Sequence, residues 1–437
     1  MRRIRLVAGA VVAAALTGVL LFGRHADATR AAKPSSSDTA VLSQLLDGLS
    51  HGDTAAYIAR LERRLARRGE DGDTLLLLGL AYQQRARETG NPRFYSLSGE
   101  ALRRANRYPQ ASPLAVAGLA SLAVSRHRFR AAVQLARAAL RANPDDATAL
   151  GALGDAWLNV GRYRKAFVAY NRMAFLSPSV ASYSRIAHGR ELIGRPRAAA
   201  EAVRLALTLR VPVREHRAAA LVQLGNLEFN TGHLGAARRS YAGALAALPG
   251  YIHAEAGLAH VETASGDYRD GLPRFRHVVE RLPLPQYAIW YGDALGRAGR
   301  AGEARRTYAL VDVIARLQAA NGVRTELQTA LFDLDHGRQL ADALARAREA
   351  YARAPSIDAE DVLGWALLRN GDCRRAQWHA RRSLRLGTHD ALKEFHRGMI
   401  ERCLGHPGSA RAWFRRALAL NPQFSLLWAP LARRYAA

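Results

Sequence analysis

The sequence predicts an all-α protein, a right-handed superhelical solenoid of about ten stacked helix-turn-helix units with capping helices. Three observations predict this fold: a recurring proline, a small residue 12 positions before it, and apolar residues at helical spacing in between. The prolines are Pro144, Pro178, Pro212, Pro249, Pro283, Pro355 and Pro422, and the first three stand 34 residues apart. The small residues are Ala132, Ala166, Ala200, Ala237, Gly271, Ala343 and Ala410.

The N-terminal segment, residues 1–28, has the pattern of a signal peptide or of a membrane anchor. Three arginines within the first five residues precede 18 uncharged residues, 6–23, and Ala26 and Ala28 fit a signal-peptidase site. The apolar run also just reaches membrane-spanning length, so cleavage and retention both stay open. In either case we expect export across the inner membrane, with the repeats periplasmic, extracellular or anchored outside the cytoplasm.

Residues 29–37 are expected to form a short polar linker, and residues 38–71 two N-terminal capping helices broken at Gly52. Residues 48–52 spell G-x-S-x-G within this stretch. A serine nucleophile with that motif needs a strand before it, whereas residues 41–49 have helical spacing. We therefore predict no catalytic serine here.

One unit, Thr148 to Pro178, shows why the pattern makes a helical hairpin. Apolar residues fall at helical spacing on both sides of Gly161, which ends the first helix. Gly154 and Ala166 are small enough to let the two helix axes approach closely. Pro178 ends the second helix because proline has no amide donor. A single hairpin cannot bury its apolar face, so the units must stack.

Such units are expected over residues 72–422, and residues 423–437 should form a C-terminal capping helix. The first helices should begin near Gly72, Pro113, Ala147, Ala181, Ala218, Ile252, Pro285, Arg324, Ile357 and Ala391. In the first unit, residues 84–93 are expected to lengthen the turn between the helices. The irregular spacing between Pro283 and Arg324 is expected to fall in a loop.

The pattern resembles the tetratricopeptide repeat (TPR) of bacterial exported or membrane-anchored proteins. Glycines stand 24 residues before several of the prolines, and leucines precede two of them. Aromatic residues fill the position eight before proline, namely Tyr170, Tyr241, Phe275 and Phe414. The resemblance implies a scaffold rather than an enzyme, with no catalytic residues.

The resemblance also implies a concave surface, built from the first helix of each unit, that binds a peptide segment or a partner protein. Asparagine amides suit this role because they donate to and accept from a peptide backbone, and tryptophan dominates interface hot spots. The candidates for this groove are Asp155, Asn159, Arg185, Asn226, Asn230, His253, His260, Trp290, Asp293 and Trp365. For each of them the alternative is solvated helix surface or local packing. Some TPR proteins hold a C-terminal carboxylate with paired lysines, but Lys33, Lys165 and Lys393 are too few and too dispersed for this.

The net charge is +27, and only three of the 64 basic residues are lysines. Arginines on solvated helix faces explain this charge, and an anionic envelope polymer or a membrane surface of lipid head groups is the functional alternative. Nucleic acid is not expected, because the chain is exported and has no recognition module. No cofactor or metal site is expected, because phosphate-binding glycine loops and metal-ligand motifs are missing and the 14 histidines are scattered.

Both cysteines fall in the last two units, Cys373 at the start of one second helix and Cys403 at the end of the next first helix. Those helix ends should lie on the same edge of adjacent layers. An exported chain meets oxidising conditions, so a disulfide is one hypothesis, and two separate buried thiols are the other. The function predicted from the whole sequence is that of a peptide-binding or protein-binding scaffold in cell-envelope assembly or secretion.

Overall fold

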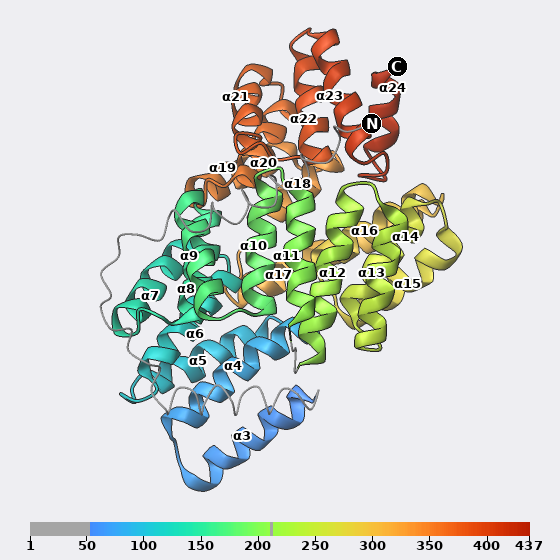
Figure 1. Ribbon diagram of the computed structural model, residues 1–437. Helices are drawn as coiled ribbons and strands as arrows, with labels where there is room; N and C mark the ends of the chain where they lie inside the picture. The colour runs from blue at the N-terminus through green and yellow to red at the C-terminus, as the bar shows by residue number, and fades with distance from the viewer. Residues whose placement is uncertain (1–52, 210–212) are drawn as a thin grey trace, which may run out of the picture. The chain divides into compact units, whose positions relative to one another are not determined.

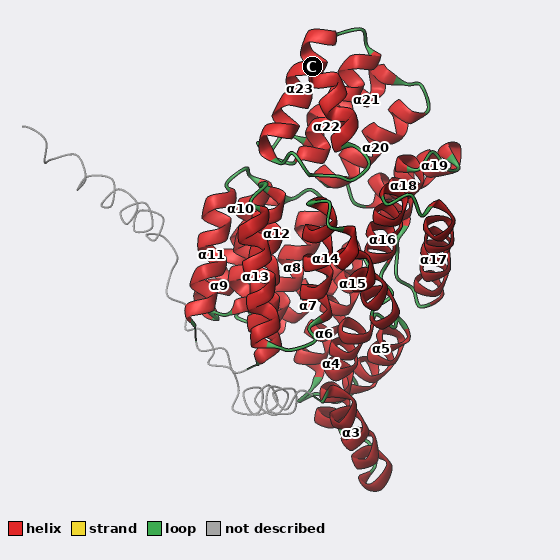
Figure 2. Ribbon diagram, turned by 90° about the vertical axis from the view of Figure 1, so that its right-hand side faces the viewer, coloured by secondary structure: helices red, strands yellow, loops and turns green. Residues whose placement is uncertain are grey.

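The fold is described by a computed structural model over residues 53–209 and 213–437. Every described helix belongs to one compact unit, which lies within residues 35–437. Over the described ranges this unit contains helices and loops but no strand (Figure 2). None of the described helices is long and apolar enough to cross a membrane. The expected signal or anchor segment, the polar linker and the helix before Gly52 lie outside the described residues.

Ten helix pairs form the array, and the two helices of a pair pack side by side, as α10 and α11 do in Figure 1. The first helices are α4 (Gly72–Thr89), α6 (Ser112–Ser125), α8 (Ala147–Asn159), α10 (Val180–Leu192), α12 (Arg214–Asn230), α14 (Ile252–Ala264), α16 (Pro285–Arg297), α18 (Glu326–Asp335), α20 (Ile357–Arg369) and α22 (Ala391–Cys403). The second helices are α5 (Arg93–Ala105), α7 (Phe129–Ala142), α9 (Tyr163–Leu176), α11 (Pro196–Thr208), α13 (Leu234–Ala247), α15 (Tyr268–Arg281), α17 (Ala301–Ala320), α19 (Leu340–Arg353), α21 (Cys373–Ser383) and α23 (Pro407–Leu420). All ten first helices begin within four residues of the positions expected from the sequence.

Two helices flank the array. Before it, α3 (Thr54–Arg68) buries Tyr57, Ile58 and Leu61 in a cluster with the leucines of α4. After it, α24 (Ala429–Ala436) buries Ala432 in the cluster of the last units. Both helices therefore cover apolar surface that a terminal unit would otherwise expose.

Close approach of the paired helices depends on glycine. In four pairs, a glycine of the first helix faces an aromatic ring of the second, and a Cβ added there would lie far inside contact distance of the ring. The pairs are Gly154 with Tyr170 (2.4 Å), Gly225 with Tyr241 (2.5 Å), Gly292 with Tyr308 (2.2 Å) and Gly398 with Phe414 (2.6 Å). The recurring glycine and the recurring aromatic residue of the sequence therefore pack against each other.

Two expectations about loops were wrong. Residues 84–89 do not lengthen a turn, because α4 continues as helix to Thr89 and only Gly90–Pro92 connect it to α5. The irregular spacing after Pro283 is likewise taken up by a second helix, α17, that runs for 20 residues. Residues 84–89 of α4 and residues 315–320 of α17 continue their helices because they contain no glycine or proline that would interrupt them.

Helix ends of early units contact helix ends of late units. The Ile357 amide donates to the Tyr163 hydroxyl at 2.7 Å, and the Asn421 side chain donates to the Phe229 carbonyl at 2.8 Å. These partners are separated by 194 and 192 residues. The array therefore curves back on itself within the described unit, and the faces of several first helices converge on a common space.

Candidate functional site

The predicted groove residues that follow the helix-packing glycines join the two helices of their own unit. Asp155 accepts a hydrogen bond from the Tyr170 hydroxyl at 2.9 Å, and the same bond joins Asn226 to Tyr241 and Asp293 to Tyr308 at 2.7 and 2.8 Å. Each acceptor lies 15 residues before its tyrosine. In each of these three residues, one side-chain oxygen is therefore engaged in local packing rather than free to bind a ligand.

Asp155 is also paired across units. The Arg185 guanidinium donates to both of its carboxylate oxygens, at 2.9 Å from Nε and 2.8 Å from Nη2. Asn159 donates to the Asp155 carbonyl at 2.9 Å within its own helix. This fork-shaped ion pair connects α8 to α10, so Asp155 and Arg185 offer little free binding capacity to a ligand.

The concave surface contains a cavity of about 570 Å³, which we call the concave cavity. It is lined by the inner ends of α10, α12, α14, α16, α18, α20 and α22 and by the segment after α23. The lining includes four of the ten candidates, Asn230, His260, Trp290 and Asp293. The others, Asp155, Asn159, Arg185, Asn226, His253 and Trp365, are not part of it.

An aromatic stack forms one wall of the concave cavity. His260 lies between Phe229 and Trp290, with ring centroids 4.2 Å apart on each side. Burial lowers the pKa of His260 to about 4, so the ring is neutral at physiological pH. His253 lies on the same helix, where its Nδ1 is 2.6 Å from the Tyr287 hydroxyl. The two histidines therefore serve separate contacts.

Trp365 does not present an exposed anchor. It is 1% exposed, its ring stacks on His396 at 4.3 Å, and its indole N–H donates to Asp335 at 2.9 Å. The expectation failed because α20 is covered on this side by α22 and by the segment after α23. The tryptophan that lines the concave cavity here is Trp428, whose indole donates to Asp335 at 3.2 Å.

Asp335, which the sequence did not single out, is the most distinctive carboxylate of the cavity. It lies at the end of α18, and one of its oxygens accepts both indole hydrogen bonds. Among the described residues it makes no ion pair. Burial raises the pKa of Asp335 to about 6, against the opposing charges of His396 and His336. The sequence signal was weak, because only its place at the end of a first helix marked this residue.

The other four carboxylates of the lining have cationic or polar partners. Asp358 and Asp390 pair with the Lys393 ammonium at 2.9 and 2.7 Å. Glu191 accepts from Asn230 at 3.1 Å. Asp293 is 2.9 Å from His336 Nε2. Burial lowers the pKa of His336, but the Asp293 carboxylate raises it by more, so the pKa is higher than usual. Asp335 is therefore the cavity carboxylate available to an incoming cation.

A segment of the chain itself borders the cavity. Residues 421–428 run from the end of α23 toward α24, and their Leu426 packs in the cluster that contains Trp290 and Tyr287. Nothing in the sequence periodicity indicated this contact, because the segment follows the last repeat. The concave cavity is thus closed on one side by the end of the array.

The structure joins Cys373 and Cys403 in a disulfide with the two Cα atoms 6.0 Å apart. Over the described residues, no group of three or more His, Cys, Asp or Glu side chains is placed to hold a metal ion. The serine of the G-x-S-x-G sequence lies outside the described residues.

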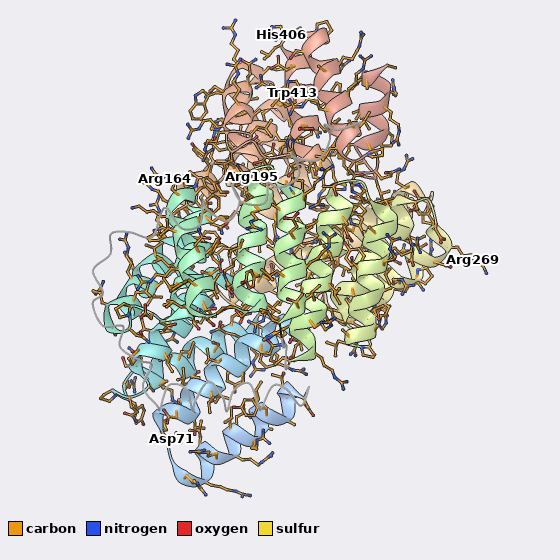
Figure 3. All side chains as sticks on the ribbon, in the orientation of Figure 1. Asp71, Arg164, Arg195, Arg269, His406 and Trp413 are labelled. Atoms are coloured by element: carbon orange, nitrogen blue, oxygen red, sulfur yellow. A yellow bond between two sulfur atoms is a disulfide. The ribbon has the colours of Figure 1, made fainter. Side chains whose placement is uncertain are left out.

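The arginines lie mainly away from the concave cavity. No arginine belongs to its lining within the part of the chain that the structure describes. Arg164, Arg195 and Arg269 are exposed, and Figure 3 shows the Arg269 side chain extending outward from the tip of α15. This distribution matches the interpretation that many of them occupy solvated helix faces.

Fold and cavity together define a class, an all-α array of helical hairpins whose first helices line a concave surface. A tetratricopeptide repeat family model matches residues 118–181, 257–316 and 362–423. These three stretches of the chain are tetratricopeptide repeats. Such an array is a scaffold fold that serves protein–protein interaction in general, and no catalytic family is indicated.

Solved structures that resemble the chain include the APC/C hetero-tetramer Cut9–Hcn1, at 13% identity over 92% of this chain and 97% of that one, with a TM-score of 0.38. Yeast Tom70 matches at 13% identity over 82% and 94%, with a TM-score of 0.35. MamA matches at 19% identity over 39% and 91%, with a TM-score of 0.29. These distant likenesses carry no weight in assigning a function. No curated protein matches the sequence.

Proposed function

We propose that this protein is a non-enzymatic scaffold that holds a segment of a partner protein in the concave cavity. The observation that carries the proposal is the lining, which combines five carboxylates with the aromatic rings of Phe229, Trp290, Phe332, Phe424 and Trp428. A volume of about 570 Å³ falls within the roughly 300–1,000 Å³ common for binding sites. Apolar walls with a few fixed polar groups suit a short peptide segment.

The lining favours a segment with one basic side chain among apolar ones. Asp335 lacks a cationic partner in the described structure, and the rings of Trp428 and Phe332 lie beside it in the lining. An ammonium or guanidinium group placed there would gain a charge-assisted hydrogen bond and contact with aromatic faces. An anionic envelope polymer or lipid head group is disfavoured inside the cavity, because the same carboxylates would repel it.

We also propose that the scaffold works outside the cytoplasm, in cell-envelope assembly or secretion. The support is the sequence of residues 1–28, three early arginines followed by an uncharged stretch. Mass spectrometry of the mature N-terminus from fractionated cells tests this. A start at Thr29 or an intact anchor in the membrane fraction supports export, and an intact chain in the cytosol contradicts it.

Site-specific photocrosslinking tests the cavity as the binding site. A photoreactive residue replaces Gln328, an exposed residue of the cavity lining, and in a matched control it replaces Arg269 on α15. We expect a discrete protein adduct from position 328 and none from position 269. Adducts of equal yield and identity from both positions would rule out the cavity as the site.

Asp335→Asn tests the basic anchor. The amide oxygen can still accept the two indole hydrogen bonds, but the charge is lost, so we expect affinity for the captured segment to fall at least tenfold. Glu280→Gln, on exposed α15 surface, removes the same charge elsewhere and should leave affinity unchanged. Equal affinities for both variants in fluorescence anisotropy, with a synthetic peptide of the captured segment, would refute the anchor.

Binding of that peptide should strengthen as pH rises from about 5 to 7. The pKa of Asp335 is about 6, so the carboxyl is mostly neutral at the lower pH and mostly charged at the higher one. The rise should be smaller in Asp335→Asn, and an equal rise in both proteins would show that Asp335 does not contribute.

A further inference from the structure

A second pocket, outside the concave cavity, collects arginines. It has a volume of about 420 Å³ and is lined by His127, Arg128, Phe129, Arg130, Ala131, Arg324, Arg353 and Ala354. We call it the arginine pocket. Its walls are the start of α7, the loop before α18 and the end of α19, which come from units about 200 residues apart.

Backbone contacts hold these walls in place. The Arg324 amide donates to the Arg126 carbonyl at 3.3 Å, and His127 Nδ1 is 2.6 Å from the Arg324 carbonyl. The Arg130 guanidinium donates to the Ala352 carbonyl at 2.8 Å. The pocket is therefore part of the packing between distant units rather than a chance meeting of mobile side chains.

The charges in the arginine pocket are unbalanced. Arg353 pairs with Glu326 at 3.0 Å and also with Glu349. The side chains of Arg128 and Arg324 make no hydrogen bond or ion pair with any described residue. Burial, the charge of Arg353 and the charge of Arg128 all lower the pKa of Arg324, as expected for guanidinium groups held near one another.

The start of α7 adds to this positive potential. Arg128 is the N-cap residue of α7, no side chain caps the helix, and its first turn contains no acidic residue. The first amides of a helix have no partner within the helix, and they lie at the positive end of its dipole. Arginine is also the N-cap residue of α9 and α11, so at α7 this feature only adds to the positive charge that the clustered guanidinium groups supply.

We propose that the arginine pocket binds a phosphate group, held by the guanidinium groups of Arg128 and Arg324 and by the first amides of α7. A guanidinium presents a planar fork of donors that matches two oxygens of a phosphate, which a lysine ammonium cannot do. The site is independent of the concave cavity, which is acidic. The phosphate group could be free phosphate or a phosphomonoester in a lipid head group.

Thermal unfolding of the full chain in sodium phosphate and in sodium chloride of equal ionic strength is the first measurement. We expect phosphate to raise the melting temperature of the wild type and isothermal titration with inorganic phosphate to give a saturable signal. Arg128→Gln and Arg324→Gln should each weaken phosphate binding at least tenfold. Arg269→Gln, which removes the same charge from the tip of α15, should bind phosphate like the wild type.

The same variants separate binding from a structural role. Removing one of several clustered like charges should leave Arg128→Gln at least as stable as the wild type in chloride, whereas loss of a structural contact would lower its melting temperature. Equal stabilisation by phosphate and chloride in the wild type, or the same loss of phosphate binding in Arg269→Gln, would overturn the proposal.

Vesicles distinguish the source of the phosphate group. Sedimentation with phosphatidic acid vesicles that depends on Arg128 and Arg324, against phosphatidylcholine vesicles as control, assigns the pocket to a lipid phosphomonoester. Binding of inorganic phosphate without such sedimentation assigns it to a soluble phosphate. Failure of both assays refutes the pocket and leaves the concave cavity untouched, because the peptide-binding test with Asp335→Asn concerns a residue that lines the cavity and not the arginine pocket.

Discussion

Replacing Gly292 by alanine is expected to lower the free energy of unfolding by about 1–3 kcal/mol, the usual cost of overpacking a tightly filled contact. The added Cβ would lie 2.2 Å from the Tyr308 ring, which cannot move freely because its hydroxyl donates to Asp293. The α16 and α17 axes would have to separate, and that displacement would also disturb the Asp293 side of the concave cavity. Chemical denaturation followed by circular dichroism measures the change.

Gly296→Ala is the matched control, four residues further along the same helix. No atom lies within 4 Å of a Cβ added there, so this substitution should stabilise the helix by roughly 0.5–1 kcal/mol through helix propensity alone. Gly292→Ala combined with Tyr308→Leu, which removes the ring, should recover part of the lost stability. If Gly292→Ala were as stable as Gly296→Ala, the helices would not be packed through this glycine.

The periodic features of the sequence predicted the array because each has one local cause. The proline after a second helix and the small residue 12 positions before it mark seven of the ten pairs, and the predicted starts of all ten agree with the structure to within four residues. The extra residues of α4 and α17 were misassigned to loops, since a fixed repeat length cannot tell a longer turn from a longer helix. Helix propensity along residues 84–89 favoured the latter.

The groove residues show the limits of the same reasoning. Register placed Asp155, Asn226 and Asp293 on the first helices, but the tyrosine that each one binds follows 15 residues later, a spacing that was readable in the sequence. Where phenylalanine replaces tyrosine at Phe414, the corresponding position is the apolar Met399. A polar residue at the position after the glycine therefore indicates a hydrogen bond to the tyrosine of the same unit, and not by itself a ligand-binding residue.

Asp335, Trp428 and the arginine pocket could not be predicted from the repeat pattern. Each depends on contacts between units separated by about 90 to 220 residues, such as Trp428 to Asp335 and Arg130 to Ala352. Such contacts follow from the curvature of the whole array, which sums small rotations at every unit. No single repeat contains that information.

Reducing the disulfide between Cys373 and Cys403 is expected to destabilise the last two units by about 3 kcal/mol. The two cysteines are separated by 30 residues, and a cross-link over a loop of that length restricts the unfolded chain by about this amount. The separation of 6.0 Å between their α-carbons lies in the range that disulfides prefer. Because units of a solenoid are stabilised mainly by their neighbours, the loss should be concentrated in α20–α24.

Hydrogen exchange measured with and without reductant tests this directly. Amides of α21–α23 should exchange faster after reduction, and those of α6–α9 should not change. A Cys373→Ser, Cys403→Ser double variant should behave like the reduced wild type and ignore reductant. Two thiols alkylated in denaturant without reductant, together with equal mobility on reducing and non-reducing gels, would show that the cysteines are not bridged; the C-terminal units would then depend on packing around Phe395 and Phe414 alone.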